Sequence, residues 1–186
     1  MHAYMAVAKA EGLQASGELG GLTVDEAAAV ALYTAESAFY RKLNECLRQR
    51  DRSALKPFFP YLRLLLQARD KLPKHTQAVW RGVKGVDLTK DFPKGKKIFW
   101  WQFTSTSKNV STLLNPMFLG TSGTRTQFMI EAFSGIDVQR FSMLDSEAEV
   151  LLFPGTQLEV IDVATIAPGL YQVHLKEIAV PMQLFK

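Results

Sequence analysis

Between residues 23 and 48, apolar residues recur at steps of three and four, and this spacing predicts one long amphipathic helix with a broad buried face. The helix has a start signal, since Thr23 and Glu26 form a capping box in which each side chain satisfies a backbone N–H group. Three arginines within residues 48–52 suit the negative end of the helix dipole.

A second helix is predicted over residues 61–71, because Pro57 and Pro60 interrupt the first pattern and Pro73 marks the end of the next one. Residues 1–21 contain four glycines and no regular apolar period. We therefore expect these residues to form a linker or a loosely held lead-in.

Beyond His75 the chain changes to short runs rich in valine, threonine and aromatic residues, separated by Gly, Pro, Asn and Asp. Runs of this kind predict β-strands. Strands are expected at residues 78–83, 98–106, 126–133, 147–153, 158–166 and 171–180, with a short helix at 110–114. Helices followed by strands, without regular alternation, predict an α+β domain with a largely antiparallel sheet.

The composition favours a single globular domain. A chain of 186 residues can bury a self-supporting core, and 47% hydrophobic with 22% charged residues is typical of folded proteins. The net charge of +4 is spread along the chain, apart from the run K-G-K-K at residues 94–97. Such a run between apolar segments is typical of a solvated loop, so no nucleic-acid partner is predicted.

Several classes of site are not predicted. The single Cys46 cannot form an intramolecular disulfide, and the three histidines lack metal-ligand spacing, so no metal is expected. There is no GxSxG elbow, no GxxxxGK[ST] loop and no GxGxxG after a strand. Without a signal-peptide pattern or about 18 consecutive apolar residues, we expect a soluble domain with no membrane partner, either cytoplasmic or secreted.

Two glutamates, Glu147 and Glu149, open the apolar run V-L-L-F-P-G. Alternate side chains of a strand share a face, which would place the two carboxylates about 7 Å apart. Like charges this close tend to raise the pKa of the less solvated acid, which prepares two acids for different catalytic roles. The pair alone is more typical of a solvated strand end and needs support from other residues.

Two further segments carry candidate binding groups. In V-W-R-G-V, residues 79–83, the guanidinium of Arg81 suits a phosphate or carboxylate, and Gly82 would let a ligand approach the backbone. In F-T-S-T-S, residues 103–107, Ser105 and Ser107 share a strand face and could hydrogen-bond a carboxylate or a ribose. Each segment alone also fits a structural role, as an arginine paired with an acid or as a turn or helix cap.

Taken together and in this order, the R-G strand, the F-T-S-T-S strand end and the E-x-E-V-L-L-F-P-G strand resemble the arginine-serine-glutamate class of arginine-specific mono-ADP-ribosyltransferases. The helical half is similar to that family as well, so the resemblance runs from about residue 22 to the C-terminus. It implies an ADP-ribosyltransferase fold, with N-terminal helices followed by a largely antiparallel two-sheet β core around an NAD cleft. Residues 22–186 would be the catalytic domain and residues 1–21 its lead-in or linker.

The resemblance implies a role for each residue of the three motifs. Arg81 would hold the NAD pyrophosphate, and the backbone of Arg81 and Gly82 would hold the nicotinamide carboxamide. Ser105 would orient the catalytic Glu149. A glutamate at the position of Glu147 goes, in that family, with modification of arginine.

Further contacts are implied around the motifs. Thr106 and Ser107 would complete the cofactor contacts of their strand. Residues 109–125 would form the loop that closes over the phosphates and the nicotinamide, with Phe118 stacking on the ring and Arg125 giving a second phosphate contact.

The turn before the E-x-E motif, residues 134–145, would recognise the target protein. There Phe133 or Phe141 would present an aromatic surface to the target. Together with Glu147, these residues are the predicted substrate-recognition set.

The implied reaction transfers ADP-ribose from NAD or NADP to an arginine of a target protein and releases nicotinamide. Small guanidines such as agmatine would replace the target, no metal would take part, and the chain would act as a monomer with the properties of a toxin-like effector. Two alternatives stay open: an NAD glycohydrolase whose acceptor is water, and an NAD-binding module without turnover.

Overall fold

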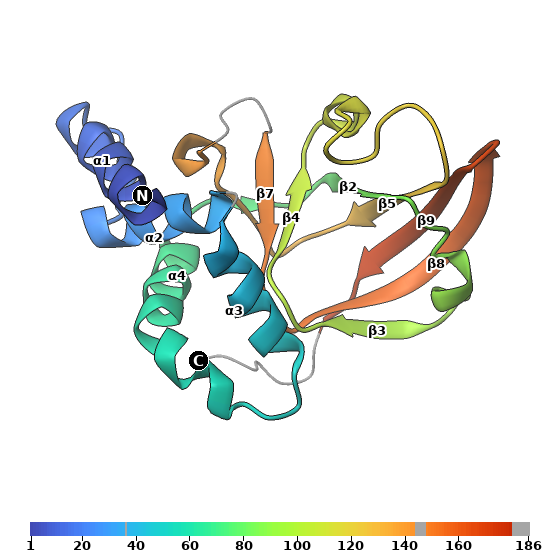
Figure 1. Cartoon of the computed structure of the whole chain (residues 1–186), viewed down its shortest axis with the longest axis horizontal. Helices are drawn as coiled ribbons and strands as arrows, with labels where there is room; N and C mark the ends of the chain where they lie inside the picture. Colours follow the sequence, from blue (N-terminus) through green and yellow to red (C-terminus); the bar gives the residue numbers. More distant parts are fainter. Residues whose placement is uncertain (36, 144–147, 180–186) are drawn as a thin grey trace. The chain divides into compact units, whose positions relative to one another are not determined.

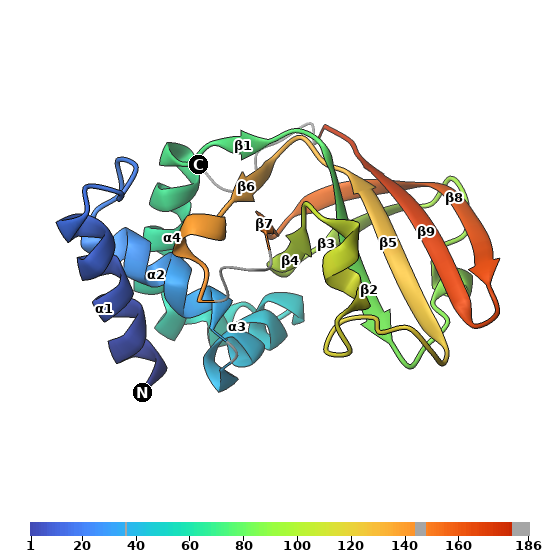
Figure 2. The ribbon, with the colours of Figure 1, turned by 90° about the horizontal axis from the view of Figure 1, so that it is seen from above.

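The computed structural model describes residues 1–35, 37–143 and 148–179, and the chain divides into two compact units. Unit 1 contains residues 1–74 and 136–149, and unit 2 contains residues 75–135 and the chain from residue 150 on. Figures 1 and 2 together label the α-helices and strands.

Unit 1 is mainly helical. Its elements are α1 (His2–Ala15), α2 (Val24–Thr34), α3 (Ala38–Arg48), η1 (Ser53–Phe58), α4 (Phe59–Lys71) and the short 3-10 helix η4 (Gln139–Phe141). Helix α2 packs against both α1 and α4 (Figure 1). No helix in the described parts of the chain has the length and apolar character needed to span a bilayer.

Helix α1 replaces the irregular lead-in expected at the start of the chain. Ala6 and Ala10 are buried, and Gly12 lies inside the helix without ending it. A single glycine costs a helix about 1 kcal/mol, a loss that burial of one face can offset. The prediction of a loose segment is wrong for residues 2–15, which belong to unit 1.

The predicted long helix is two helices. Helix α2 ends at Thr34, and Ala35 and Ser37 both have extended backbones. After the break, the Asn44 side chain donates a hydrogen bond to the Tyr33 hydroxyl at 3.0 Å. The apolar spacing continued through the break because both helices bury one face, so periodicity alone did not reveal it.

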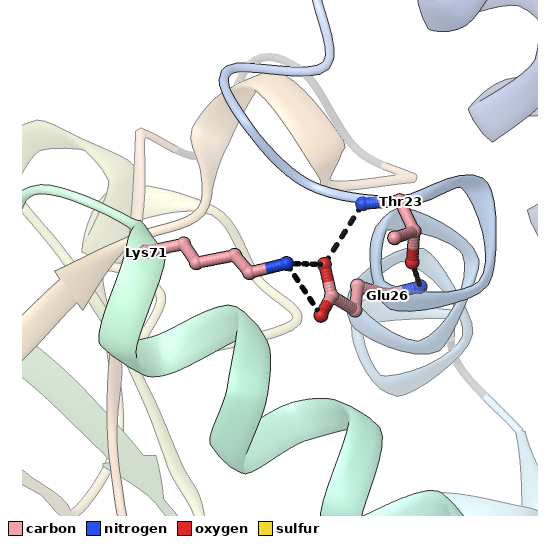
Figure 3. Close-up of polar contacts among 3 residues, drawn as sticks. All are labelled: Thr23, Glu26 and Lys71. Carbon is pink, nitrogen blue, oxygen red and sulfur yellow. Dashed lines mark hydrogen bonds and ion pairs between the residues drawn. The ribbon is translucent and has the colours of Figure 1, made fainter.

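The predicted capping box is present at the start of α2 (Figure 3). The Glu26 N–H donates to Thr23 Oγ1 at 3.2 Å, the Thr23 N–H donates to Glu26 Oε2 at 2.8 Å, and Lys71 Nζ reaches both Glu26 oxygens at 2.7 and 2.8 Å. Burial raises the pKa of Glu26, but the hydrogen bonds from Lys71 and Thr23 outweigh it and leave this pKa below its usual value. The same carboxylate therefore caps α2 and ties it to α4.

Helix α3 buries the only cysteine of the chain. Leu43, Cys46 and Leu47 form its inner face, and Cys46 is 2% exposed. The thiol is free, and the sequence holds no second cysteine to pair with it. Cys46 thus acts as a small apolar core residue.

The described strands form one nine-stranded sheet. They are β1 (Lys74–His75), β2 (Ala78–Lys84), β3 (Lys97–Trp100), β4 (Thr104–Ser107), β5 (Arg125–Glu131), β6 (Gly135–Asp137), β7 (Glu149–Leu152), β8 (Thr156–Ala167) and β9 (Leu170–Glu177). Their order is β1-β6-β7-β4-β2-β5-β9-β8-β3, and Figure 2 shows β2, β5, β9 and β8 side by side. Two short 3-10 helices, η2 (Thr89–Asp91) and η3 (Val110–Leu114), lie between strands, the second where a helix was predicted.

The α+β class is confirmed, and the sheet is largely antiparallel, with β5 and β9 as a parallel pair. The two-sheet arrangement is wrong, because β4 pairs with β2 at Trp80 and Ser107 and so joins the two halves into one sheet. The single strand predicted at residues 98–106 is also two strands. Its first part, β3, pairs with β8, whereas β4 lies between β7 and β2.

The core of unit 2 comes from alternate residues of its long strands. Its buried members are Val79, Phe128, Ile130, Ala132, Val150, Leu152, Leu158, Val160, Val173 and Leu175. This core fixes which face of each strand carries side chains that are available for binding.

Candidate functional site

Arg81 and Ser105 lie in contact within unit 2. Arg81 is half-buried in the middle of β2, where it is registered opposite Phe128 of β5. Its Nη1 donates a hydrogen bond to the Ser105 carbonyl of β4 at 2.9 Å. A charge-assisted hydrogen bond of this kind fixes the guanidinium against the neighbouring strand, so two of the four predicted catalytic residues are brought together.

The hydroxyls of Thr106 and Ser107, also on β4, have structural partners. Thr106 is buried, and its Oγ1 donates to the Val150 carbonyl at 2.7 Å, which leaves any cofactor contact to its main chain. Ser107 Oγ accepts from the Asn109 N–H at 3.1 Å and donates to Thr112 Oγ1 at 3.0 Å. Ser107 therefore holds the start of the loop that begins at Asn109.

Gly82 faces a side chain of this loop. A Cβ atom built on Gly82 would lie 2.8 Å from Leu119 Cβ and 3.2 Å from the Leu119 backbone nitrogen, far inside normal contact. The missing side chain leaves room for the buried Leu119, and the approach of a ligand to the Gly82 backbone stays a prediction. The preceding residue, Phe118, is half-buried, and its stacking on nicotinamide stays a prediction.

Arg125 begins β5, opposite Lys84 in the register of β2. It is 9% exposed, and its Nη1 donates to the Gly123 carbonyl at 2.7 Å. Its Nε is buried and has no hydrogen-bond partner among the described residues. The structure thus places a cation at this end of the sheet, and the predicted phosphate contact stays a prediction.

Glu149 belongs to unit 1 and is the first residue of β7. Its side chain is 3% exposed, and its Oε2 accepts a hydrogen bond from Ser142 Oγ at 3.0 Å. Its carbonyl accepts from the Val138 N–H at 3.1 Å. In the strand order β7 is followed by β4 and then β2, so the three strands that carry the motifs are consecutive.

The strand predicted from residue 147 does not include Ala148. Ala148 has φ 46°, in the left-handed region, and β7 begins at Glu149. The predicted separation of the two carboxylates depends on Glu147 and stays a prediction. Glu147 itself lies outside the described residues, so its predicted role stays a prediction.

The predicted recognition turn contains β6 and η4. Phe133 is 47% exposed, and its N–H donates to Glu177 Oε2 at 2.7 Å, which fits an aromatic surface on a fixed backbone. Phe141 is 3% exposed because η4 turns it into unit 1. The prediction that Phe141 presents an aromatic surface is therefore wrong.

A pocket with both polar and apolar lining lies within unit 1 beside η4. It encloses about 490 Å³ and is lined by Gly20, Leu72, Pro73, Asp137, Gln139, Arg140 and Phe141. Its charged groups already have partners: Asp137 Oδ1 accepts from the Gln139 N–H at 3.1 Å, and Arg140 Nη1 donates to the Glu18 carbonyl at 3.2 Å. The described residues contain no cluster of three or more His, Cys, Asp or Glu that could hold a metal.

Two residues that contact predicted site residues were not themselves predicted from the sequence, Leu119 and Ser142. Leu119 has no signal beyond an apolar residue in a loop, and Ser142 is one serine in a turn. Both matter only through the residue that they contact, Gly82 for Leu119 and Glu149 for Ser142.

The chain matches a family described as NAD:arginine ADP-ribosyltransferase over residues 10–181, a match that begins inside α1. It is 30% identical over 146 residues to the NAD(P)(+)–arginine ADP-ribosyltransferase 1 of Gallus gallus, covering 74% of this chain and 44% of the chicken protein. The chain spans about half the length of the curated relatives it matches.

Solved structures of ADP-ribosyltransferases share the fold. The Vis toxin of Vibrio splendidus, in a complex with agmatine, superposes with a TM-score of 0.69 at 21% identity, covering 95% of this chain and 84% of the toxin chain. Exoenzyme S of Pseudomonas aeruginosa, in a complex with a human 14-3-3 protein and carba-NAD, gives a TM-score of 0.66 at 26% identity, covering 91% and 82%. The resemblance first seen in the three motifs is confirmed, and the chain belongs to the NAD:arginine ADP-ribosyltransferase family.

Proposed function

We propose that this chain cleaves NAD at the nicotinamide–ribose bond and transfers ADP-ribose to the guanidine group of a protein arginine. The observation that carries the proposal is the hydrogen bond from Arg81 to Ser105 in a chain of this family, because it joins two motif residues expected at one NAD site. The structure of exoenzyme S with carba-NAD supports NAD as the co-substrate.

In the proposed reaction, the C1′–N bond breaks and nicotinamide leaves with the bonding electron pair. The ribose becomes oxocarbenium-like, as in glycoside cleavage, and a carboxylate is the group that stabilises such a cation. Glu149, hydrogen-bonded to the ribose 2′-hydroxyl and oriented by Ser105, takes this role. Arg81 binds the pyrophosphate, where a planar fixed cation is well suited.

The acceptor step assigns arginine specificity to Glu147. A guanidinium is a poor nucleophile until it loses a proton, so Glu147 aligns the target arginine and takes that proton as its nitrogen bonds to C1′. The products are ADP-ribosylated arginine, nicotinamide and one proton, which Glu147 passes to water, so charge and atoms balance without a metal. Phe133, exposed at the start of the recognition turn, contacts the target protein in this proposal.

Incubation of the protein with NAD, with and without agmatine, tests the proposal. We expect release of nicotinamide in both samples and ADP-ribosyl-agmatine in the second, measured by liquid chromatography and mass spectrometry. Nicotinamide release without the agmatine product would favour the glycohydrolase alternative. An unchanged NAD concentration would favour a binding module without turnover.

A further inference from the structure

The side chain of Ser142 contacts the Glu149 carboxylate directly. Ser142 is completely buried, at 0% exposure, and its Oγ donates to Glu149 Oε2 at 3.0 Å. A hydroxyl that donates to one carboxylate oxygen restricts rotation of the carboxylate plane. Both residues belong to unit 1.

Several elements of unit 1 fix the backbone around Ser142. The Ser142 N–H donates to the Val138 carbonyl at 2.9 Å, and the Ser142 carbonyl accepts a hydrogen bond from Lys9 Nζ of α1. The next N–H, of Met143, donates to Thr34 Oγ1 at the end of α2, at 2.9 Å. The hydroxyl therefore cannot follow Glu149 freely, and it holds the carboxylate from a fixed position.

We propose that Ser142 is a positioning residue for Glu149, and that Lys9 of α1 and Thr34 of α2 hold it in place. The proposal rests on the proposed function, because it assigns to Ser142 a role in the step that Glu149 catalyses. It also gives α1 a part in the catalytic apparatus, since Lys9 contacts the backbone of the positioning residue. Ser142 is separate from Ser105, the serine that the family resemblance assigns to Glu149.

The test compares Ser142→Ala with Thr156→Val. Both substitutions remove a buried hydroxyl that makes a hydrogen bond, but Thr156 Oγ1 donates to the Phe153 carbonyl at 2.7 Å and has no place in the proposed site. We expect S142A to lower kcat for nicotinamide release about tenfold, the usual effect of one hydrogen bond to a charged group, with KM for NAD nearly unchanged. T156V should leave kcat as it is and lower only the melting temperature.

A double substitution separates positioning from a general structural role. If Ser142 acts through Glu149, then S142A should add less than about twofold to the loss caused by Glu149→Gln, because the group it positions is already gone. Ser142→Cys, which keeps the size of the side chain with a weaker donor, should fold as the wild type and lose part of kcat.

Three results would overturn the inference. They are a kcat of S142A within about twofold of the wild type, equal losses in S142A and T156V, and full additivity of S142A with E149Q. Failure of the proposed function looks different, since the wild-type protein would then leave NAD intact. A wild type that releases nicotinamide, together with an unchanged S142A, would remove the role of Ser142 and leave the proposed function standing.

Discussion

The two units hold their predicted catalytic residues in different ways. In unit 2, Arg81 and Ser105 lie on regular strands, and the register of β2 with its neighbours sets their positions. In unit 1, Glu149 follows a left-handed residue at the very start of β7, and a serine from a turn contacts its carboxylate. One region relies on a ladder of many backbone hydrogen bonds, the other on a few side-chain contacts.

This difference indicates where single substitutions should affect the proposed activity most. A strand is held by many equivalent bonds, so loss of one side chain leaves its neighbours in register. A carboxylate at a strand end that a buried hydroxyl orients loses part of its orientation when that contact is lost. We therefore expect changes around Glu149 to affect turnover at nearly constant stability, and changes in β2 to affect binding or stability.

The largest effect is expected for Glu149→Gln. Removal of the charge that stabilises the developing cation should lower both nicotinamide release and transfer to agmatine by about 10²-fold or more. Steady-state rates with NAD, with and without agmatine, measure both activities, and circular dichroism controls for folding. A variant that keeps either activity at the wild-type rate would contradict the role of Glu149.

Glu147→Gln should affect transfer to agmatine and cleavage of NAD differently. Without the group that takes the proton of the acceptor, transfer to agmatine should fall by about 10²-fold, whereas NAD should still be cleaved with water as the acceptor. The ratio of ADP-ribosyl-agmatine to nicotinamide measures the division. Equal loss of both activities in E147Q and E149Q would show that the two glutamates do not have separate steps.

Arg81→Lys tests the strand-held half of the site. Lysine keeps the charge but loses the planar guanidinium that reaches the Ser105 carbonyl, so we expect kcat/KM for NAD to fall about tenfold, mainly through KM. The matched control is Arg63→Lys on the exposed surface of α4, which should behave as the wild type. A decrease in kcat at constant KM would place Arg81 in the chemical step instead of NAD binding.

Gly82→Ala tests the contact with Leu119. The added methyl would lie 2.8 Å from Leu119 Cβ, and overpacking of this kind costs about 1–3 kcal/mol of unfolding free energy. Urea unfolding measures the loss, and Leu119→Ala in the same chain should recover part of it by making room. The control is Gly12→Ala, at a helical glycine with open space around it, which should be neutral or stabilising. If G82A were as stable as the wild type, the loop that carries Leu119 would have to move away without a cost in free energy.

The smallest effect is expected for Glu26→Gln, which touches only the helical framework of unit 1. Loss of the capping charge and of the ion pair with the partly exposed Lys71 should cost about 1 kcal/mol at neutral pH. The pKa of Glu26 is lower in the folded state. The contribution of Glu26 to the free energy of unfolding is therefore complete above pH 4.5, its usual pKa, and disappears as the pH falls through the folded-state pKa. Melting curves of wild type and E26Q should therefore converge in acid; a difference that stays constant down to pH 3 would contradict the assignment.

The sequence predicted best the features that local chemistry determines. Helix α4 was predicted within two residues of its start, because Pro60 and Pro73 mark its ends, and the capping box at Thr23 was correct. The strand of Arg81, predicted at residues 78–83 from its residue types and period, agrees with β2 within one residue. The R-S-E motifs identified the family, although the roles of their residues stay predictions.

The sequence did not predict features that depend on contacts between distant residues. The break between α2 and α3 has no glycine or proline, and the amphipathic period runs through it. The left-handed Ala148 carries a side chain that normally avoids this conformation. Ser142 and Leu119 gained their importance only when the turn and the loop brought them to Glu149 and Gly82.

The buried Cys46 allows the dynamics of unit 1 to be measured without an engineered label. A thiol that is 2% exposed can react with a disulfide reagent only when α3 opens, so the rate of labelling reports the free energy of that opening. Because the chain has no second cysteine, the signal comes from unit 1 alone. Labelling kinetics with and without NAD would thus read out whether the co-substrate tightens the helical unit that carries Glu149.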